Sequence, residues 1–356
     1  MTLLLSASDA EQVISIERAI EALEQAFADL EEGRAADRPR ARVYTNLQPD
    51  LFYLFSSMDG SLPRFGVHGI RMTSEHIAPM RIEGHLSQER PATAPGGKYI
   101  RLILIFSIET AELLAILQDL IVNRYMVGAT SAIAAKYLSR KESRRVGLLG
   151  AGRLATTQLL GLKAVRPIEH VKVFSRREDR RLEFCKKWTE ILGIPVEPVS
   201  SAREAVSGVD IVACATNAFE PVLHGDWLEP GQHVGSLQGD EIDWEVLERS
   251  SILSCRSIEK ETFWFTRGQL PVEYVNKKEL PPWLLHKCRG LGEMVIGRAG
   301  RHSPEEITFH GGGRMGVSGG LGIQELAVAY TVYEEAKKRG LGREIPTDWF
   351  LQPTPM

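Results

Sequence analysis

The spacing of hydrophobic side chains divides the chain into a first part of mixed helix and strand and a second part in which strands and helices alternate. Apolar residues at helical spacing predict a helix that runs to about Leu30. Short β-like runs follow and predict an antiparallel sheet, whereas residues 80–97, which include several prolines and glycines, are typical of a long surface loop. The expected strands are residues 42–45, 51–56, 65–72, 99–106 and 113–117.

The second part begins after a helix of small residues at 126–138 and a polar hinge at 139–145. Strands that alternate with helices at this pitch indicate βαβ units and therefore a parallel sheet. An amphipathic helix at 322–338 is expected to return and pack on the first part. The predicted fold class is α/β, with a doubly wound parallel sheet over 126–322 and an α+β domain built from both chain ends, 1–125 and 323–356. The expected strands of the second part are 146–149, 170–174, 196–199, 210–215, 232–237 and 252–255.

Composition and charge narrow the kinds of partner. Hydrophobic residues make up 43% and charged residues 25% of the 356 positions, which is typical of a globular protein. The 43 basic and 46 acidic side chains give a net charge of −3, so no overall positive field attracts nucleic acid or an anionic membrane. No apolar run approaches the roughly 18 residues that span a bilayer, and the N-terminus lacks a signal-peptide pattern. We therefore expect a small-molecule substrate, with neither nucleic acid nor membrane as partner.

The cysteines and histidines give no sign of a metal site. The four cysteines lie too far apart in the sequence for a CxxC pair, and the nine histidines show no HxxxH or HExxH spacing. In a chain of this size such cysteines are typical of reduced thiols. We therefore expect no metal and a cytoplasmic location.

Glycine is enriched, with 32 residues, and one cluster follows a predicted strand. Gly150, Gly152 and Ala155 form a GxGxxA pattern between that strand and a helix. Gly150 would allow a tight turn, Gly152 would let the backbone approach a pyrophosphate, and Ala155 would permit close helix–strand packing. Because strand, turn and helix are in register, we interpret this segment as a Rossmann-type dinucleotide site, the alternative being an ordinary structural turn.

The end of the next strand bears on the choice of cofactor. An acidic residue about 20 positions after the glycines would favour NAD(H), but this chain has Ser175, Arg176 and Arg177 there. A hydroxyl and guanidinium groups suit a 2′-phosphate, so we expect NADP(H) to be preferred, with NAD(H) as the other candidate. The alternative is that Arg177 only begins a solvated helix.

An acidic residue follows a later strand of the parallel sheet. Asp240 comes shortly after residues 234–237, and ligands bind such sheets in the crevice at the carboxyl ends of the strands. A carboxylate there can take or give the proton that accompanies hydride transfer at an amine or imine. Asp243 is the better candidate for the N-cap of the following helix, which leaves Asp240 as the candidate acid/base.

Several further segments, taken together, are specific to one family. They are residues 102–106 with Glu109 and Thr110, the helix 129–138, the dinucleotide segment 146–176, and residues 210–216, 220–223 and 319–326. With these segments the sequence resembles the ornithine cyclodeaminase/mu-crystallin family over nearly its whole length. The resemblance implies a homodimer that carries out hydride chemistry on amino acids, cyclic ketimines or related imines.

The resemblance also assigns roles to single residues. It makes Asp240 the catalytic aspartate, places Arg71 where the family usually has a substrate-binding lysine, and maps a substrate arginine to Arg42, with Arg40 as the other candidate. The glycine-rich segment 311–322 becomes a loop beside the cofactor. The implied cofactor positions are Gly150, Gly152, Arg153, Leu154, Ser175, Thr216, Asn217, Val234, Gly235, Ser236, Leu237 and Gly319.

Two departures from the family pattern affect the substrate site. Met126 replaces an arginine that usually reads the substrate carboxylate, and Arg124 lies about 200° away around a helix, so it can substitute only if this start is not helical. The Pro-Gly-Lys that often follows the catalytic aspartate is absent, since Asp240 leads directly into Glu241. We therefore expect a less charged or differently oriented substrate than ornithine or alanine.

Three functions are compatible with this pattern. The favoured one is an NAD(P)H-dependent imine reductase or amino acid dehydrogenase. The second is a true cyclodeaminase, which recycles its cofactor internally and releases ammonia. The third is a non-catalytic NADP-dependent ligand-binding protein of the mu-crystallin kind, in which Met126 marks a lost carboxylate site.

Overall fold

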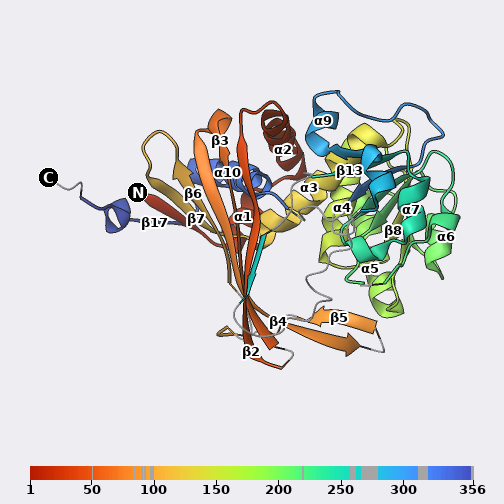
Figure 1. Ribbon diagram of the computed structural model, residues 1–356, viewed down its shortest axis with the longest axis horizontal. Coiled ribbons are helices and arrows are strands. Elements are labelled where there is room, and N and C mark those ends of the chain that lie inside the picture. The colour runs from red at the N-terminus through yellow and green to blue at the C-terminus, as the bar shows by residue number, and fades with distance from the viewer. Residues whose placement is uncertain are drawn as a thin grey trace.

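A computed structural model describes residues 1–49, 51–82, 85–89, 91, 94–96, 100–218, 220–256, 262–265, 280–311 and 320–353, with the backbone alone at 79–82, 85–89 and 262–265. Two sheets lie side by side, joined by a long helix, and both chain ends lie at the far edge of the first sheet (Figure 1). The dinucleotide segment belongs to the second sheet.

The first sheet is mixed and, within the described residues, has nine strands. Burial alternates strictly along its third strand, so Phe52, Leu54 and Met58 point to one face, as a half-buried strand requires. In spatial order the sheet runs β14 (Thr262–Phe265), β2 (Ala36–Gln48), β3 (Leu51–Leu62), β4 (Val67–Ile82), β6 (Ile100–Ser107), β7 (Leu113–Gln118), β1 (Thr2–Leu5) and β17 (Arg343–Ile345), and β5 (His85–Glu89) pairs with β4.

Helices cover one face of this sheet, and they come from both ends of the chain (Figure 1). They are α1 (Ala7–Val13), α2 (Ile16–Glu31) and the returning α10 (Gly322–Arg339). Two strand glycines let α10 approach closely: a Cβ on Gly60 would lie 2.6 Å from Cγ2 of Ile323, and one on Gly69 would lie 2.5 Å from Cδ1 of Leu326. The predicted return of the C-terminal helix is therefore confirmed.

The second sheet is parallel throughout and has eight strands in the described part of the chain. The chain builds it outward from β8 in one direction and then from β11 in the other, which is the doubly wound arrangement predicted. Its order is β10 (Val196–Pro198), β9 (His170–Phe174), β8 (Arg145–Leu149), β11 (Ile211–Cys214), β12 (His233–Ser236), β16 (Thr308–Gly311), β13 (Ile252–Cys255) and β15 (Cys288–Gly290). Among the helices of this part of the chain are α4 (Arg153–Val165), α5 (Glu178–Leu192), α6 (Ala202–Val206), α7 (Trp244–Arg249) and α9 (Leu291–Val295).

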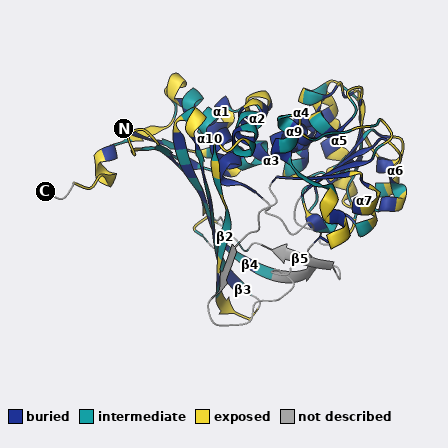
Figure 2. Ribbon diagram, turned by 45° about the horizontal axis from the view of Figure 1, so that its top comes forward, coloured by how far each residue is buried: buried dark blue, intermediate teal, exposed yellow. Residues whose placement is uncertain are grey.

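The helix α3 (Leu120–Leu138) packs against α2 and α10 on one side and α4 on the other, and burial is high along its length (Figure 2). Small residues permit that approach, because a Cβ on Gly128 would lie 2.5 Å from the carbonyl oxygen of Thr157. Gly161 of α4 meets the Gly128 carbonyl in the same way. The dinucleotide segment is thereby held at a fixed position relative to the first sheet.

Some predicted elements were wrong in extent. The helix expected up to Leu30 is a strand and two helices, because Ser15 interrupts the run and caps α2 by accepting a hydrogen bond from the Arg18 amide. The loop expected at 80–97 is partly a hairpin of β4 and β5, in which pairing within the sheet overrides the local proline and glycine signals. The helix expected to begin at Met126 begins at Leu120. The segment Thr262–Phe265 pairs with β2 of the first sheet, although it lies within the range predicted for the second domain.

Candidate active site

The turn after β8 has the geometry that the GxGxxA pattern predicts. Gly150 has φ +113°, and a Cβ there would lie 2.4 Å from the Ala215 carbonyl oxygen, so glycine is required. Gly152 is the N-cap of α4, and a Cβ there would meet nothing within 4 Å, so its backbone is open to a ligand. Ala155 is fully buried against the sheet, while Arg153 is exposed and Leu154 is half-buried in the first turn of α4.

The other cofactor positions from the later strands gather at the same edge of the sheet. Thr216 follows β11, and its Cγ2 would lie 3.3 Å from a Cβ on Gly150, so the two turns are in contact. Ser236 ends the neighbouring strand β12 and Leu237 directly follows it, while Asn217 is exposed. The side chain of Val234 lies in the core, and Gly235 is half-buried in β12. Apart from Val234, these residues lie at the carboxyl edge of the sheet close to the switch point between β8 and β11, where doubly wound sheets bind ligands.

A buried carboxylate that the sequence reasoning missed holds this edge together. Glu241 has no exposed surface, and it accepts hydrogen bonds from Thr216, Ser236, Leu237 and Gln238. Burial raises the pKa of the Glu241 carboxyl, and the hydrogen bonds oppose that rise. The signal was present in the Glu-Ile-Asp triplet, but an acidic residue between Asp240 and Asp243 gives no local sign of burial.

At the end of β9 the three residues proposed for a 2′-phosphate differ in their surroundings. Arg176 is exposed, whereas the guanidinium of Arg177 donates to Asp179 at 2.6 Å in the first turn of α5. Arg181, further along α5, is mostly buried: its Nη1 donates to the Ser175 carbonyl at 2.7 Å, and its guanidinium lies 5.6 Å from the Phe174 ring centroid. Of these arginines, Arg176 is the exposed one beside Ser175, while Arg177 is paired with Asp179 and Arg181 with the Ser175 carbonyl.

Asp240 is half-buried in a short 3₁₀ turn, η3 (Gly239–Glu241), that follows β12. It therefore belongs to the loop that carries Ser236 and Leu237 at the carboxyl edge of the sheet. Asp243 caps α7 by accepting a hydrogen bond from the Val246 amide at 3.1 Å, which confirms its predicted capping role. Asp240 is therefore placed at the carboxyl edge of the sheet, as the sequence predicted, and its role as acid/base stays a prediction.

Arg71 lies in a buried group of opposite charges. It donates from Nε to Asp119 at 2.7 Å, and Glu325 lies 3.6 Å away. The Asn123 amide donates to Glu325 at 2.7 Å. Burial raises the pKa of Glu325 and the nearby Asp119 adds to the rise, whereas the charge of Arg71 lowers it. A substrate carboxylate would therefore compete with Asp119 for Arg71, a competition that the sequence did not reveal.

The two arginines considered for the first substrate contact lie in β2. Arg42 pairs with Ser56 across the β2–β3 ladder, and its Nη1 lies 3.5 Å from the Tyr44 hydroxyl. Arg40 lies nearer the Arg71 group, because its Nη2 would be 2.8 Å from a Cβ on Gly320 and its charge lowers the pKa of Glu325. Both side chains are partly buried at the helix-covered sheet.

Arg124 and Met126 both lie in α3, but their side chains have different surroundings. Arg124 is helical, and its Nη2 lies 3.5 Å from Glu11 of α1, so the condition under which it could take the place of Met126 is not met. Met126 is 4% exposed within the apolar core and accepts a long hydrogen bond from Thr130 at 3.6 Å. Met126 therefore offers no charged group to a substrate and packs as an apolar side chain.

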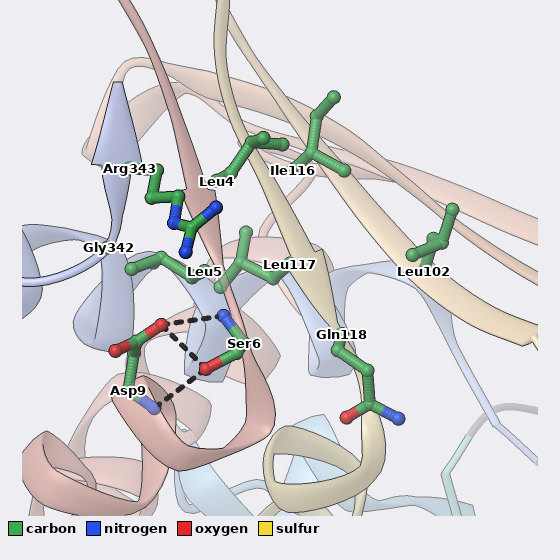
Figure 3. Close-up of a pocket in the computed structure, with 10 residues that line it drawn as sticks. All are labelled: Leu4, Leu5, Ser6, Asp9, Leu102, Ile116, Leu117, Gln118, Gly342 and Arg343. Atoms are coloured by element: carbon green, nitrogen blue, oxygen red, sulfur yellow. Dashed lines mark hydrogen bonds between the residues drawn. The ribbon is translucent and has the colours of Figure 1, made fainter. Parts of the chain in front are cut away.

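A hollow of about 500 Å³ lies elsewhere, at the edge of the first sheet (Figure 3). Its polar groups Ser6 and Asp9 bond to each other and cap α1. The lining contains no residue of the dinucleotide turn and none of the residues at the carboxyl ends of β11 and β12. The lining residues are Leu4, Leu5, Ser6, Asp9, Leu102, Ile116, Leu117, Gln118, Gly342 and Arg343.

Some expectations fall outside the structure that is described. Gly319 and residues 312–318 of the glycine-rich segment lie outside the described residues. Within the described ranges, no cluster of three or more His, Cys, Asp or Glu side chains is arranged to bind a metal ion. Among the same residues, no helix has the length and apolar character needed to cross a bilayer.

Comparison with known proteins gives matches over the whole chain. Residues 1–340 match the model of the ornithine cyclodeaminase/mu-crystallin family. The chain is 31% identical over 351 residues to alanine dehydrogenase of Archaeoglobus fulgidus, which covers 97% of this chain and 98% of that protein. It is 29% identical over 248 residues to Δ1-pyrroline-2-carboxylate reductase of Bacillus cereus, covering 68% and 73% of the two chains.

Solved structures agree with these matches. Δ1-Pyrroline-2-carboxylate reductase of Thermococcus litoralis, in complex with NADH and L-proline, superimposes with a TM-score of 0.76 at 29% identity, covering 97% of this chain and 100% of that one. An archaeal alanine dehydrogenase dimer with bound NAD gives a TM-score of 0.76 at 27% identity, covering 97% and 99%.

Proposed function

Because the chain belongs to the ornithine cyclodeaminase/mu-crystallin family, we propose that it is an NAD(P)H-dependent oxidoreductase that acts on an imine, ketimine or amino-acid-like substrate. The observation that carries the proposal is the open backbone at Gly152, at the N-terminus of α4 and beside the carboxyl ends of β8 and β11. This is a cradle for a pyrophosphate. The likeness to a reductase and a dehydrogenase over most of the chain supports the reaction class.

In the proposed mechanism the chain supplies binding and proton transfer. When bound, the nicotinamide supplies or accepts the hydride at the carbon of the C–N bond. Gly152 and the first turn of α4 would hold the pyrophosphate, and Thr216 with Ser236 would flank the ribose and nicotinamide side. Asp240 would give or take the proton at the substrate nitrogen. Arg71 and Arg42 would hold an acidic group of the substrate.

The test is a substrate screen with the purified protein. Keto acids with amines, cyclic imines and amino acids are incubated with NADPH or NADP⁺, and the absorbance of the reduced nicotinamide is followed. We expect net consumption or production of NADPH with at least one substrate class. Ammonia release from an amino acid without net change in NADPH would instead establish a cyclodeaminase.

The position of Met126 favours a second candidate, a non-catalytic NADP-dependent binder. The side chain is packed in the core, and Arg71 is already engaged by Asp119, so two groups that would hold a substrate carboxylate are compromised. Turnover in the unmodified protein that falls by about 10²-fold or more in Asp240→Asn, as loss of an acid/base predicts, would exclude the binder. Ligand binding without any turnover would establish it.

For the cofactor we propose that NADP(H) is preferred and that NAD(H) can also bind. Ser175 and Arg176 lie at the strand end where the ribose is expected, and Arg181 adds positive charge beside Ser175. Comparing the Kd of NADPH and NADH in the unmodified protein and in Arg176→Ala tests this. Equal affinity for both, unchanged in the variant, would rule out recognition of the 2′-phosphate by this arginine.

We propose that two copies associate through the face of the first sheet that α1, α2 and α10 leave uncovered (Figure 1). That face carries half-buried apolar side chains from adjacent strands, among them Ile70, Met72, Leu102, Leu104 and Phe106. Uncovered apolar sheet faces of this kind are typical of subunit interfaces. Sedimentation velocity should give a dimer that dissociates in Met72→Glu; a monomeric unmodified protein would contradict the proposal.

Two further expectations join this proposal. The four cysteines are free thiols, which supports a cytoplasmic location. We also propose that residues 126–322 fold as the dinucleotide domain and that 1–125 with 323–356 form the substrate and dimerisation domain. The separation of the two sheets supports this division, with the exception of β14 (Thr262–Phe265), which lies in the range 126–322 but pairs with β2 of the first sheet.

A further inference from the structure

The buried carboxylate of Glu241 links two loops that leave neighbouring strands. Its Oε1 accepts from the Thr216 amide at 2.6 Å and from the Thr216 hydroxyl at 2.7 Å, in the loop after β11. Its Oε2 accepts from the Leu237 amide at 3.0 Å and the Gln238 amide at 2.8 Å, in the loop after β12. The Ser236 hydroxyl, at the end of β12, lies 2.9 Å from the same oxygen.

These contacts determine the local shape of both loops. The Thr216 hydroxyl also accepts a hydrogen bond from the Ala218 amide at 3.1 Å. The hydrogen-bond network around Glu241 therefore reaches two residues further along the loop. The main-chain carbonyl of Glu241 accepts from the amides of Val222 and Leu223 at 2.8 and 3.0 Å, which fixes the far end of the same loop. A single residue therefore anchors the loop after β11 at its beginning and near its end.

Burial of this group needs a reason beyond fold stability. Removing a carboxylate from water is costly, and an apolar interior built without it would avoid that cost. Here the donors include the backbone amides of Thr216 and Gln238, which no regular ladder uses at the strand ends, and the amide of Leu237, which also donates to the Cys214 carbonyl at 3.2 Å. The carboxylate satisfies them without adding a strand or a helix, so the loops stay close to the sheet edge and leave the switch point clear.

The two loops lie where the proposed cofactor would cross the sheet. Gly150 of the dinucleotide turn contacts Ala215 and Thr216, and Ser236 lies in the strand next to β11. Asp240 is the residue before Glu241 and shares its 3₁₀ turn. We propose that Glu241 is a positioning residue, which sets the two loops at the spacing that the dinucleotide requires and fixes the backbone that carries Asp240. This inference rests on the proposed function, because it assumes that NADP(H) binds at this edge.

The test is Glu241→Gln in the full chain, with NADPH as the probe. Glutamine keeps the size of the side chain, but its amide NH₂ faces the Thr216 amide or the amides of Leu237 and Gln238, so at least one hydrogen bond from a backbone amide is lost. We expect the Kd of NADPH, measured by titration calorimetry, to rise about tenfold or more, because the two loops would lose the spacing that the carboxylate sets and part of the binding free energy would be spent on restoring it. Circular dichroism should show that the fold is kept.

Asp243→Asn is the matched control. Asp243 is an acid of the same segment, but its side chain caps α7 and contacts His224 and Gly225 rather than the strand ends at Thr216 and Ser236 that the Glu241 carboxylate joins. Asparagine caps a helix about as well as aspartate, so we expect at most a small fall in melting temperature, from the amide NH₂ that replaces one acceptor of His224 and Gly225. The Kd for NADPH should stay within about twofold of the unmodified protein. A Glu241→Gln variant that loses stability but binds NADPH as the unmodified protein does would overturn the positioning role.

Thr216→Val provides a second route if Glu241→Gln does not fold. It removes one hydroxyl donor and leaves the carboxylate and the four other donors in place. We expect a severalfold rise in the Kd of NADPH, and unchanged affinity would count against the proposal. Failure of the unmodified protein to bind NADPH or NADH would overturn the proposed function and this inference together, whereas normal binding in both variants would overturn the inference alone.

Discussion

Gly150 and Gly152 are both glycines for physical reasons, but the reasons differ. Gly150 has a positive φ and no space for a Cβ beside Ala215, so the fold itself excludes other residues. Gly152 has an ordinary extended backbone and open space around it, so the fold would accept alanine. What excludes a side chain at Gly152 is therefore the ligand that we propose for this edge.

The variant Gly152→Ala should separate these two requirements. We expect its melting temperature to stay within about 2 °C of the unmodified protein, because no protein atom is displaced. The Kd of NADPH should rise about tenfold or more, since a methyl group would occupy the space of the pyrophosphate. Gly300→Ala, whose Cβ would come no nearer than 4.0 Å to the Tyr137 carbonyl, should change neither quantity. Unchanged affinity in Gly152→Ala would place the pyrophosphate elsewhere.

Removing the charge of Arg71 would leave two buried carboxylates without a cation beside them. In Arg71→Met, the buried carboxylates Asp119 and Glu325 would lose their shared cation, at a cost of about 3–5 kcal/mol in the free energy of unfolding. Arg71→Lys should lose much less. Arg144→Met, which removes an exposed ion pair with Glu169, should cost under about 1 kcal/mol. Equal losses in urea unfolding for Arg71→Met and Arg144→Met would show that the buried group is not electrostatically coupled.

At this scale the sequence predicted the turn residues well and the charged residues poorly. Gly150, Gly152, Ala155 and the cap Asp243 have local signatures that determine their geometry. Glu241 does not, because its burial depends on two loops that come from different parts of the chain. For the same reason the sequence could place Arg71 on a strand but could not show Asp119 and Glu325 beside it.

Among the elements, the contact between α3 and α4 sets the position of the dinucleotide turn. Gly128→Ala would favour the helix by up to about 1 kcal/mol through intrinsic propensity, but its Cβ would lie 2.5 Å from the Thr157 carbonyl. Overpacking against backbone costs about 1–3 kcal/mol, so we expect net destabilisation in urea unfolding. Lys136→Ala, on the exposed side of the same helix, should change stability by less than about 1 kcal/mol. A stabilised Gly128→Ala would show that the helices can separate freely.

The alternating pattern of the second part predicted its central strands to within a residue or two, as β8, β9 and β11 show. The order at the far edge could not be predicted, because β16 inserts between β12 and β13 although it follows both in the chain. Pairing of such distant segments leaves no local periodicity. The hairpin of β4 and β5 was missed for the same reason, since a partner strand stabilises residues that locally favour a turn.

For the whole molecule, two histidines in the parallel sheet should make stability depend on pH. Burial lowers the pKa of His233 to about 3, with the charges of Arg301 and Arg166 adding to the effect, and burial also lowers the pKa of His310. Both stay neutral in the folded protein, whereas the unfolded chain takes up protons near pH 6.5. Their contribution to stability is therefore present above pH 6.5 and is lost as the pH falls toward 3.

The expected slope is up to about 1.4 kcal/mol per pH unit for each histidine, measured as the free energy of unfolding between pH 7 and pH 5. In His233→Gln the side chain can still bond to Thr308. The slope should fall by up to about 1.4 kcal/mol per pH unit, the contribution of one proton taken up on unfolding. An unchanged slope in this variant would mean that His233 is protonated in the folded state.

The measurement that tests the central proposal most directly is transfer of a labelled hydride. The protein is incubated with its best substrate from the screen and with NADPH that carries deuterium at nicotinamide C4 on the transferred face. We predict one deuterium in the product, on the carbon bonded to nitrogen, detected by mass spectrometry and NMR. Product that forms without deuterium, or ammonia release without net oxidation of NADPH, would contradict the proposed reductase.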